Sequence, residues 1–161
     1  MTTDSATDPA LLHDEVAQIA ARSVLCWLAT VDGDGQPSVS PKELFAIVDS
    51  NHIVIANIAS PASARNLREQ PRVCVSFIDV LVQKGWKVFG TAHEVRPADE
   101  GFASWAAPLL DRAGTRFPLR SVFVVRATAL RRILAPSYLL YPHETTEASQ
   151  VAAARAAYRL P

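Results

Sequence analysis

Hydrophobic and polar residues alternate along much of the chain in short runs that predict β-strands joined by tight turns. Residues 24–31 are apolar on both alternations, which is typical of a strand covered on both faces. Residues 36–42 alternate cleanly, with Ser38, Ser40 and Lys42 on one side, and their prolines indicate an edge strand or a bulge. The same signals predict further strands at 44–48, 52–57, 72–80, 85–95 and 121–134.

Helical spacing predicts helices at 9–22, 61–70, 97–112 and 146–158, and an irregular segment at 136–141. Asp8-Pro9 and Ser60-Pro61 each place a capping residue before a proline, which is typical of a helix start. Few strand–helix–strand units are present, so a doubly wound parallel sheet is not expected. The pattern therefore predicts a mainly β, α+β domain: an antiparallel barrel of six or seven strands with peripheral helices.

Local signals refine this prediction at a few positions. Asp32-Gly33-Asp34-Gly35 predicts a hairpin turn; a calcium loop is excluded because Pro37 occupies the position that needs glycine. Gly90, inside a predicted strand, indicates a bulge or a close backbone approach. Cys26 and Cys74 lie in apolar runs and are expected to be reduced packing residues.

Composition limits the possible functions. The 161 residues are 49% hydrophobic and 20% charged, which fits a single globular domain over 1–161. Residues 1–8 are expected to be disordered, and 143–161 to form a helical tail. Sixteen basic residues balance sixteen acidic ones, so neither nucleic acid nor membrane is an expected partner. The polar N-terminus is unlike a signal peptide, and a cytoplasmic protein is expected.

The stretch Asn57–Asn66 joins a predicted strand to a predicted helix and is a candidate anion site. The first turn of a helix has free N–H groups and the positive end of the helix dipole. Ala62 and Ser63 supply such donors, Ser63 adds a hydroxyl, and the Arg65 side chain leans back toward the same end. If the strand that ends at Lys42 lies near this turn, its ammonium group completes a phosphate site.

Several segments occur in an order that resembles a known family. They are Ala-Thr-Val-Asp-Gly-Asp-Gly (29–35), Pro-Ser-Val-Ser-Pro-Lys (37–42), Ser-Ala-Arg-Asn-Leu-Arg (63–68), Pro-Arg-Val (71–73) and Gly-Trp-Lys-Val-Phe-Gly-Thr-Ala (85–92). Together with the amphipathic helix before them, they resemble the pyridoxamine 5′-phosphate oxidase-like flavoproteins, and in particular the small predicted flavin-nucleotide-binding members. The match runs from about residue 10 to residue 96.

The resemblance implies a split β-barrel that forms a homodimer and holds FMN in two clefts between the subunits. It implies that the flavin phosphate contacts Lys42 and the helix start, with Ser60, Ser63 and Arg65 as the matching residues; Asn66, next to Arg65, is a further candidate for cofactor binding. It places the isoalloxazine ring along the ends of two strands and near a third segment. The strand ends match Ser40-Pro41 and Ala56-Asn57, and the segment matches Lys84, Gly85 and Trp86.

The sequence departs from the vitamin B6 oxidase itself. Pro61-Ala62-Ser63 stands where that enzyme has Ser-Arg-Lys, Pro37 replaces an expected arginine, and the C-terminal Arg-x-His-like substrate signature is absent. Oxidation of pyridoxamine phosphate is therefore not expected.

The expected function is an FMN-dependent oxidoreductase that transfers hydride or electrons between a small donor, such as a nicotinamide nucleotide, and an unknown small substrate. No catalytic residue can be named. The alternatives are a flavin storage or redox-sensing protein, or a relative that binds deazaflavin or haem. Haem would need an axial histidine in the cleft segments, which contain none, and the four histidines show no metal-binding spacing.

Overall fold

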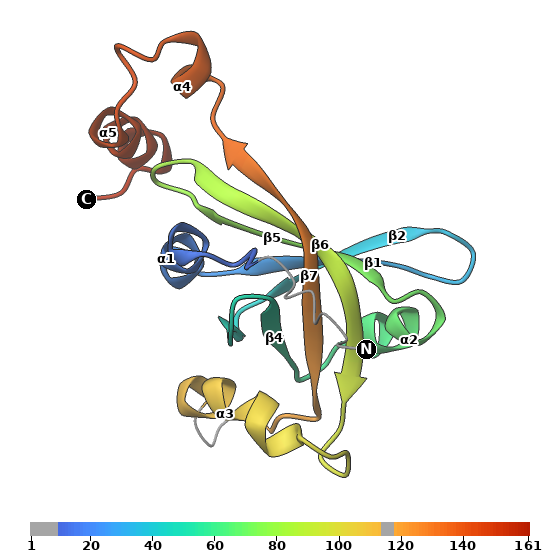
Figure 1. The fold of residues 1–161 in the computed structure, drawn as a ribbon. Coiled ribbons are helices and arrows are strands. Elements are labelled where there is room, and N and C mark those ends of the chain that lie inside the picture. The colour runs from blue at the N-terminus through green and yellow to red at the C-terminus, as the bar shows by residue number, and fades with distance from the viewer. Residues whose placement is uncertain (1–9, 114–117) are drawn as a thin grey trace, which may run out of the picture.

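The computed structural model describes residues 10–113 and 118–161, which form one curled antiparallel sheet with helices around it (Figure 1). The strands in this part of the chain are β1 Cys26–Val31, β2 Pro37–Lys42, β3 Phe45–Ile47, β4 His52–Asn57, β5 Arg72–Asp79, β6 Lys84–Val95 and β7 Ser121–Leu134. The helices are α1 Asp14–Arg22, α2 Pro61–Glu69, α3 Phe102–Ala113, α4 Ser137–Leu140 and α5 Glu147–Tyr158.

The strand order is β2-β1-β5-β6-β7-β4-β3, so two strands that are consecutive in the chain occupy opposite edges of the sheet. Only Glu43 and Leu44 connect β2 to β3, and three Cα steps span at most about 11 Å. Seven strands laid flat at about 4.8 Å spacing would place the edges about 29 Å apart. The sheet must therefore curl until its edges approach each other, which confirms the predicted split-barrel class.

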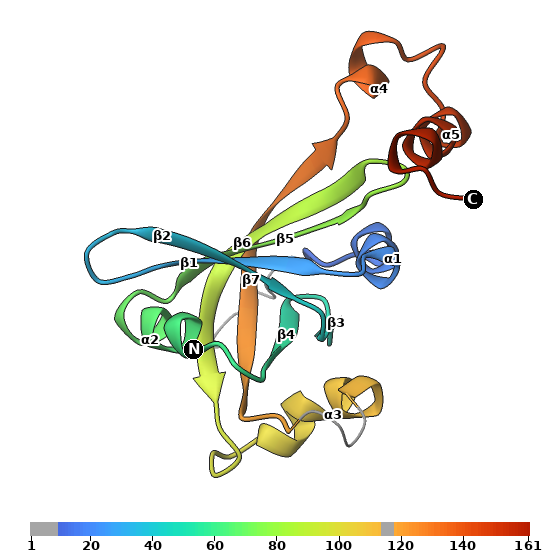
Figure 2. The same cartoon turned by 180° about the vertical axis from the view of Figure 1, so that it is seen from behind.

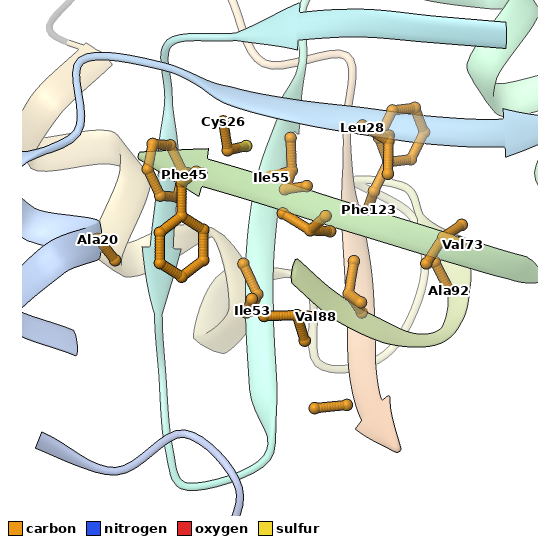
Figure 3. Packing of buried hydrophobic residues seen from close by; sticks show 14 of the residues in the cluster. Ala20, Cys26, Leu28, Phe45, Ile53, Ile55, Val73, Val88, Ala92 and Phe123 are labelled. Atoms are coloured by element: carbon orange, nitrogen blue, oxygen red, sulfur yellow. The ribbon is translucent and has the colours of Figure 1, made fainter. Parts of the chain in front are cut away.

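The inside of the curled sheet holds the main core (Figure 3). Leu28, Val75 and Val88 are direct neighbours on β1, β5 and β6, and all three are fully buried. The rings of Phe45 and Phe77 stack with centroids 6.1 Å apart. A second cluster forms where Ala106 and Leu109 of α3 pack on β4 and β7, beside Val54, Val122 and Val124. This packing fixes α3 beneath the barrel.

The last strands extend beyond the barrel. In both views β6 and β7 form a long ribbon that carries α4 and α5 to the end of the molecule opposite α3 (Figures 1 and 2). The Tyr138 hydroxyl donates to the Val82 carbonyl over 2.9 Å, and Thr146 and Ser149 form a reciprocal capping box at the start of α5. No helix in the described ranges is long and apolar enough to span a membrane.

Two local predictions about the sheet are confirmed. The proline-containing strand β2 is an edge strand. The β6–β7 register shifts between Phe89 and Gly90, and a Cβ on Gly90 would lie 2.1 Å from the Arg126 carbonyl oxygen. Gly90 therefore marks both a bulge and a close backbone approach.

Two predicted helix starts are wrong. Residues 10–13 are not helical, because the Leu11 and Leu12 N–H groups donate to the Ser50 carbonyl at 3.1 and 2.8 Å, and α1 begins at Asp14. Helix α3 begins at Phe102, after a turn in which the Arg96 N–H donates to Asp99 and Gly101 has a φ of 79°. The expected disorder of residues 1–8 lies outside the described residues.

The two cysteines and the irregular segment also differ from prediction in part. Both cysteines are free and Cys26 is buried as expected, but Cys74 is only half-buried, since it lies on the outer face of the sheet. In the β1–β5 register Cys74 faces Ala29, so the two sulfurs are not opposite each other. Residues 137–140, predicted to be irregular, form the single turn of α4.

Candidate functional site

The polar side of the edge strand β2 meets the first turn of α2. The Lys42 ammonium group donates a hydrogen bond to the Ser60 hydroxyl, and the Ser40 and Ser63 hydroxyl oxygens lie 3.4 Å apart. Alternation along β2 places Ser40 and Lys42 on the same face, which is the face toward the helix. The structure thus brings together three residues of the predicted phosphate site, Lys42, Ser60 and Ser63, and Ser40, which is predicted to lie along the flavin ring.

The start of α2 differs in one respect from the prediction. Pro61 is the first helical residue, but the Ser60 hydroxyl does not cap the helix. The Asn57 side-chain oxygen instead accepts a 3.0 Å hydrogen bond from the Ser60 N–H. Asn57 thus fixes the turn before the helix, while the Ser60 hydroxyl accepts from Lys42 instead of capping α2.

Lys42 is a buried cation. Only 6% of its surface is exposed, and it has no carboxylate within ion-pair distance in the described part of the chain. Burial lowers the pKa of Lys42, and burial raises the pKa of the neighbouring Cys26 thiol to about 12, so this thiol is no counterion. A buried ammonium group without an anion is unfavourable. The site therefore fits a ligand that brings a negative charge to Lys42.

A cleft of about 500 Å³ extends from Lys42 and Ser60. Its walls are largely apolar, and they include two predicted residues, Pro41 and Ala56. The other apolar side chains of the lining are Leu25, Leu44, Ile58, Ala59 and Ala113. An apolar cleft with a few polar groups at one end is typical of a small-molecule site.

Sequence reasoning missed part of this lining. Ile58 and Ala59 were not named as site residues, although they lie within the candidate stretch Asn57–Asn66. The end of α3 supplies Ala113 and Arg112, whose guanidinium donates to the Phe45 carbonyl over 2.8 Å. No sequence signal relates α3 to β2, because their proximity depends on the curl of the whole sheet.

Three predicted residues at the strand-to-helix connection lie outside the cleft. The Asn57 amide is buried and donates to the Ser121 hydroxyl over 2.8 Å. The Asn66 amide is buried and donates to the Thr30 hydroxyl over 3.0 Å. Arg65 is exposed on α2. Asn57 and Asn66 thus hold the helix on the sheet rather than line the cleft.

Lys84, Gly85 and Trp86 are not brought to the cleft within this chain. Lys42 pairs with Cys26, Cys26 with Phe77, and Phe77 with Trp86, so three strand spacings, about 14 Å along the sheet, separate Lys42 from Trp86. The Lys84 ammonium group binds the Glu147 carboxylate at 2.7 Å.

Trp86 and Gly85 have structural contacts of their own. The Trp86 ring contacts the His13 ring edge-on. A Cβ on Gly85 would lie 2.3 Å from the Phe77 carbonyl oxygen, so close approach to β5 explains this glycine.

The lining combines apolar side chains with the charged groups of Lys42, Glu43 and Arg112, which is suited to a ligand with an apolar body and an anionic group at Lys42. The cleft lining contains no histidine, and the described ranges contain no cluster of residues that could hold a metal ion. Fold and site together define a split β-barrel with a largely apolar cleft beside the buried Lys42, at the junction of β2 and α2.

The family model of pyridoxamine 5′-phosphate oxidase matches residues 12–133, and the chain belongs to this family. It is 29% identical over 119 residues to the pyridoxine/pyridoxamine 5′-phosphate oxidase of Edwardsiella ictaluri, a match that covers 67% of this chain and 54% of the relative. The chain therefore spans about half the length of that curated relative.

Solved structures show the same fold. An FMN-binding protein from Syntrophomonas wolfei subsp. wolfei superposes with a TM-score of 0.65 at 18% identity, over 80% of this chain and 89% of that one. An F420 reductase superposes with a TM-score of 0.58 at 25% identity, over 74% and 98% of the two chains. The family and its structural neighbours include oxidases and reductases.

Proposed function

We propose that this protein is an FMN-binding oxidoreductase that acts as a homodimer on a small substrate. The observation that carries the proposal is the buried Lys42 ammonium group, which contacts Ser60 at the start of α2 without a carboxylate partner in the described part of the chain. A phosphate monoester supplies the missing charge, and the first-turn N–H groups of α2 add donors that favour an anion.

The site residues fall into two groups, which would contact two different parts of the ligand. The Lys42 ammonium group and the hydroxyls of Ser40, Ser60 and Ser63 would hold the phosphate, with Arg65 on the exposed side. The apolar walls would receive the ring and exclude water from it. FMN supplies hydride or electron transfer when it is bound, and the protein holds and orients it.

The outer face of β1 and β2 supports the homodimer. Trp27 faces Pro41 in the β1–β2 register, and Ala29 faces Val39, so these apolar residues share one face. Trp27 is 43% exposed and Val39 59% exposed, and Pro41 also lines the cleft. A second copy related by a two-fold axis would bury this face and could bring its Lys84, Gly85 and Trp86 to the cleft. Those three residues are proposed to reach the flavin only in this way.

The structural neighbours support a flavin-type ligand, since one is an FMN-binding protein and another an F420 reductase. The F420 reductase favours a deazaflavin as the alternative cofactor. A haem alternative is less well supported because the cleft lining has no histidine. A flavin-binding protein without turnover remains the non-enzymatic alternative.

The absorption spectrum of the purified protein tests the cofactor. Flavin bands support the proposal, whereas a Soret band or a deazaflavin maximum would replace FMN by haem or deazaflavin. If the protein is purified without cofactor, fluorescence titration with FMN gives the same answer.

Anaerobic reduction then tests the enzymatic claim. Reduced nicotinamide nucleotides and reduced deazaflavin are added in turn to the FMN-loaded protein, and the flavin absorption is followed. A bound flavin that no such donor reduces would leave only the binding function.

A further inference from the structure

A second cleft, of about 300 Å³, lies on the other side of the Asn57–Ser60 turn. We call it the arginine cleft, because Arg68, Arg96 and Arg120 line it together with Glu94. The rest of its lining is Asn57, Ser60, Pro61 and Ala64. Three guanidinium groups meet one carboxylate here, so two positive charges are left without a matching negative charge in the lining.

Glu94 holds two of these arginines in place. One of its carboxylate oxygens accepts hydrogen bonds from the Ser121 hydroxyl at 2.6 Å and the Asn57 amide at 3.2 Å. The other carboxylate oxygen forms ion pairs with Arg96, whose Nη2 lies 3.1 Å away, and with Arg68, whose Nη1 lies 3.5 Å away. Burial alone would raise the pKa of Glu94, but the hydrogen bond from Ser121 and the charge of Arg96 lower it. The carboxylate therefore stays ionised and orients both guanidinium groups.

Arg120 has no such restraint. Its side chain is exposed and has no hydrogen-bond or ion-pair partner within residues 10–113 and 118–161, while its N–H donates to the Asn57 carbonyl over 3.0 Å. This backbone bond places the third guanidinium group at the cleft. A guanidinium group matches phosphate oxygens in a planar, bidentate geometry. Two oriented arginines and a free one form a receptor for a multiply charged anion.

We propose that the arginine cleft binds a second phosphate group, next to the one proposed at Lys42. Ser60 lines both clefts, so the two anions would lie on either side of one turn. The second phosphate has two chemical sources: the outer phosphate of a dinucleotide such as FAD, or the phosphate of a separate phosphorylated ligand. This inference deepens the proposed function but does not depend on it, because no arginine of the cleft contacts Lys42.

Isothermal titration with inorganic pyrophosphate tests the second site, in a Lys42→Ala background that weakens the first. We expect this variant to bind pyrophosphate, and the added substitution Arg120→Gln to weaken binding by about tenfold or more. Arg68→Gln, a second probe, should also weaken it. Arg155→Gln is the matched control, because Arg155 belongs to α5 at the other end of the molecule (Figure 1). An unchanged affinity with Arg120→Gln, or an equal loss with Arg155→Gln, would overturn the proposal.

FMN titration separates this inference from the proposed function. Arg120→Gln in the wild-type background should leave FMN affinity unchanged; a tenfold loss would mean that the arginine cleft holds the flavin phosphate, and a second site would not exist. If wild-type protein fails to bind FMN while the pyrophosphate results hold, the proposed function fails and the second site stands.

Comparison of FAD with FMN assigns the source of the second phosphate. A dinucleotide is supported if the wild-type protein binds FAD more tightly than FMN and if Arg120→Gln abolishes this difference in affinity. Equal affinities for FAD and FMN, with pyrophosphate still bound to the FMN-loaded protein, support a separate phosphorylated ligand.

Discussion

The hydrogen bond from the Lys42 ammonium group to the Ser60 hydroxyl joins the edge strand β2 to the start of α2. It crosses the opening between the two edges of the curled sheet, because Lys42 ends the strand at one edge and Ser60 follows β4 near the other. A buried cation is thus held at the point where an apolar cleft and a helix N-terminus meet. The consequences for ligand binding and stability can be measured separately.

Replacement of Lys42 by alanine should weaken FMN binding by about 1.5–3 kcal/mol, the range of a hydrogen bond to a charged group. Arg65→Ala is predicted to fall in the same range if the exposed guanidinium closes over the phosphate. Fluorescence titration with FMN measures both, with Arg155→Ala as the control for loss of one positive charge. Wild-type affinity in both variants would place the phosphate elsewhere.

Lys42→Met should stabilise the flavin-free protein by about 1 kcal/mol, because it replaces a buried cation that has no counterion by an apolar side chain of similar length. FMN should raise the unfolding midpoint of the wild-type protein more than that of the variant, since stabilisation by a ligand grows with its affinity for the folded state. Urea denaturation with and without FMN measures both effects. A variant that is less stable without FMN would show that Lys42 has a structural rather than a ligand-binding role.

Much of this site could be predicted because its signals are local. Alternation places Ser40 and Lys42 on one face of β2, and the prolines of that strand exclude it from the middle of the sheet. Proline at the first position of α2 marks the helix start. Each of these signals depends on residues only a few positions apart.

The remaining features depend on long-range pairing. The sequence of β6 shows that Trp86 alternates with Lys87, but not that β1 and β5 separate Trp86 from Lys42. The predicted capping by the Ser60 hydroxyl is absent because this hydroxyl accepts from Lys42, and that contact depends on where β2 lies. The arginine cleft joins residues from α2, the end of β6 and the start of β7, which no local pattern relates.

The affinity for FMN should fall at alkaline pH, below the ordinary lysine pKa of 10.5, because burial lowers the pKa of Lys42. A bound phosphate raises the pKa of Lys42 again. At a pH between the Lys42 pKa of the free protein and that of the complex, FMN binding therefore takes up a proton. The stability of the flavin-free protein should instead rise with pH between the lowered Lys42 pKa and 10.5. In that range Lys42 is protonated in the unfolded chain but largely neutral in the folded protein, so the unfolded chain binds more protons.

Lys42→Arg is the control for this pH dependence, since a guanidinium group does not titrate in the range. Affinity and denaturation are measured over the same pH series for both proteins. If the variant shows the same alkaline fall in affinity as the wild type, another group is responsible for it.

Glu94→Gln should destabilise the protein by about 1–3 kcal/mol at neutral pH, because Arg96 and Ser121 lose their charged partner. The pKa of Glu94 is lowered in the folded state, so its contribution is present above its ordinary value of 4.5 and is lost as the pH falls through the folded-state pKa. Denaturation midpoints of the two proteins should therefore converge under acidic conditions. If the difference between the two denaturation midpoints stays constant from neutral to acidic pH, the shape of the Glu94 side chain matters rather than its charge.

Val39→Asp should convert the proposed homodimer into monomers. Val39 is 59% exposed on the apolar outer face of β2, and a carboxylate there would be buried without a partner in a symmetric interface. Val48→Asp is the matched control, because Val48 is 38% exposed but lies beyond β3, at the opposite edge of the sheet. Light scattering coupled to size-exclusion chromatography measures the mass of each variant.

The same variant tests whether the cleft needs the partner subunit. Within one chain, Lys84, Gly85 and Trp86 are three strands away from Lys42, so FMN should bind monomeric Val39→Asp at least about tenfold more weakly if the partner supplies a charged hydrogen bond. Lys84→Ala in the wild-type background should reproduce part of that loss while leaving the dimer intact. A monomer with full FMN affinity would instead show that β2, α2 and the end of α3 form the complete site.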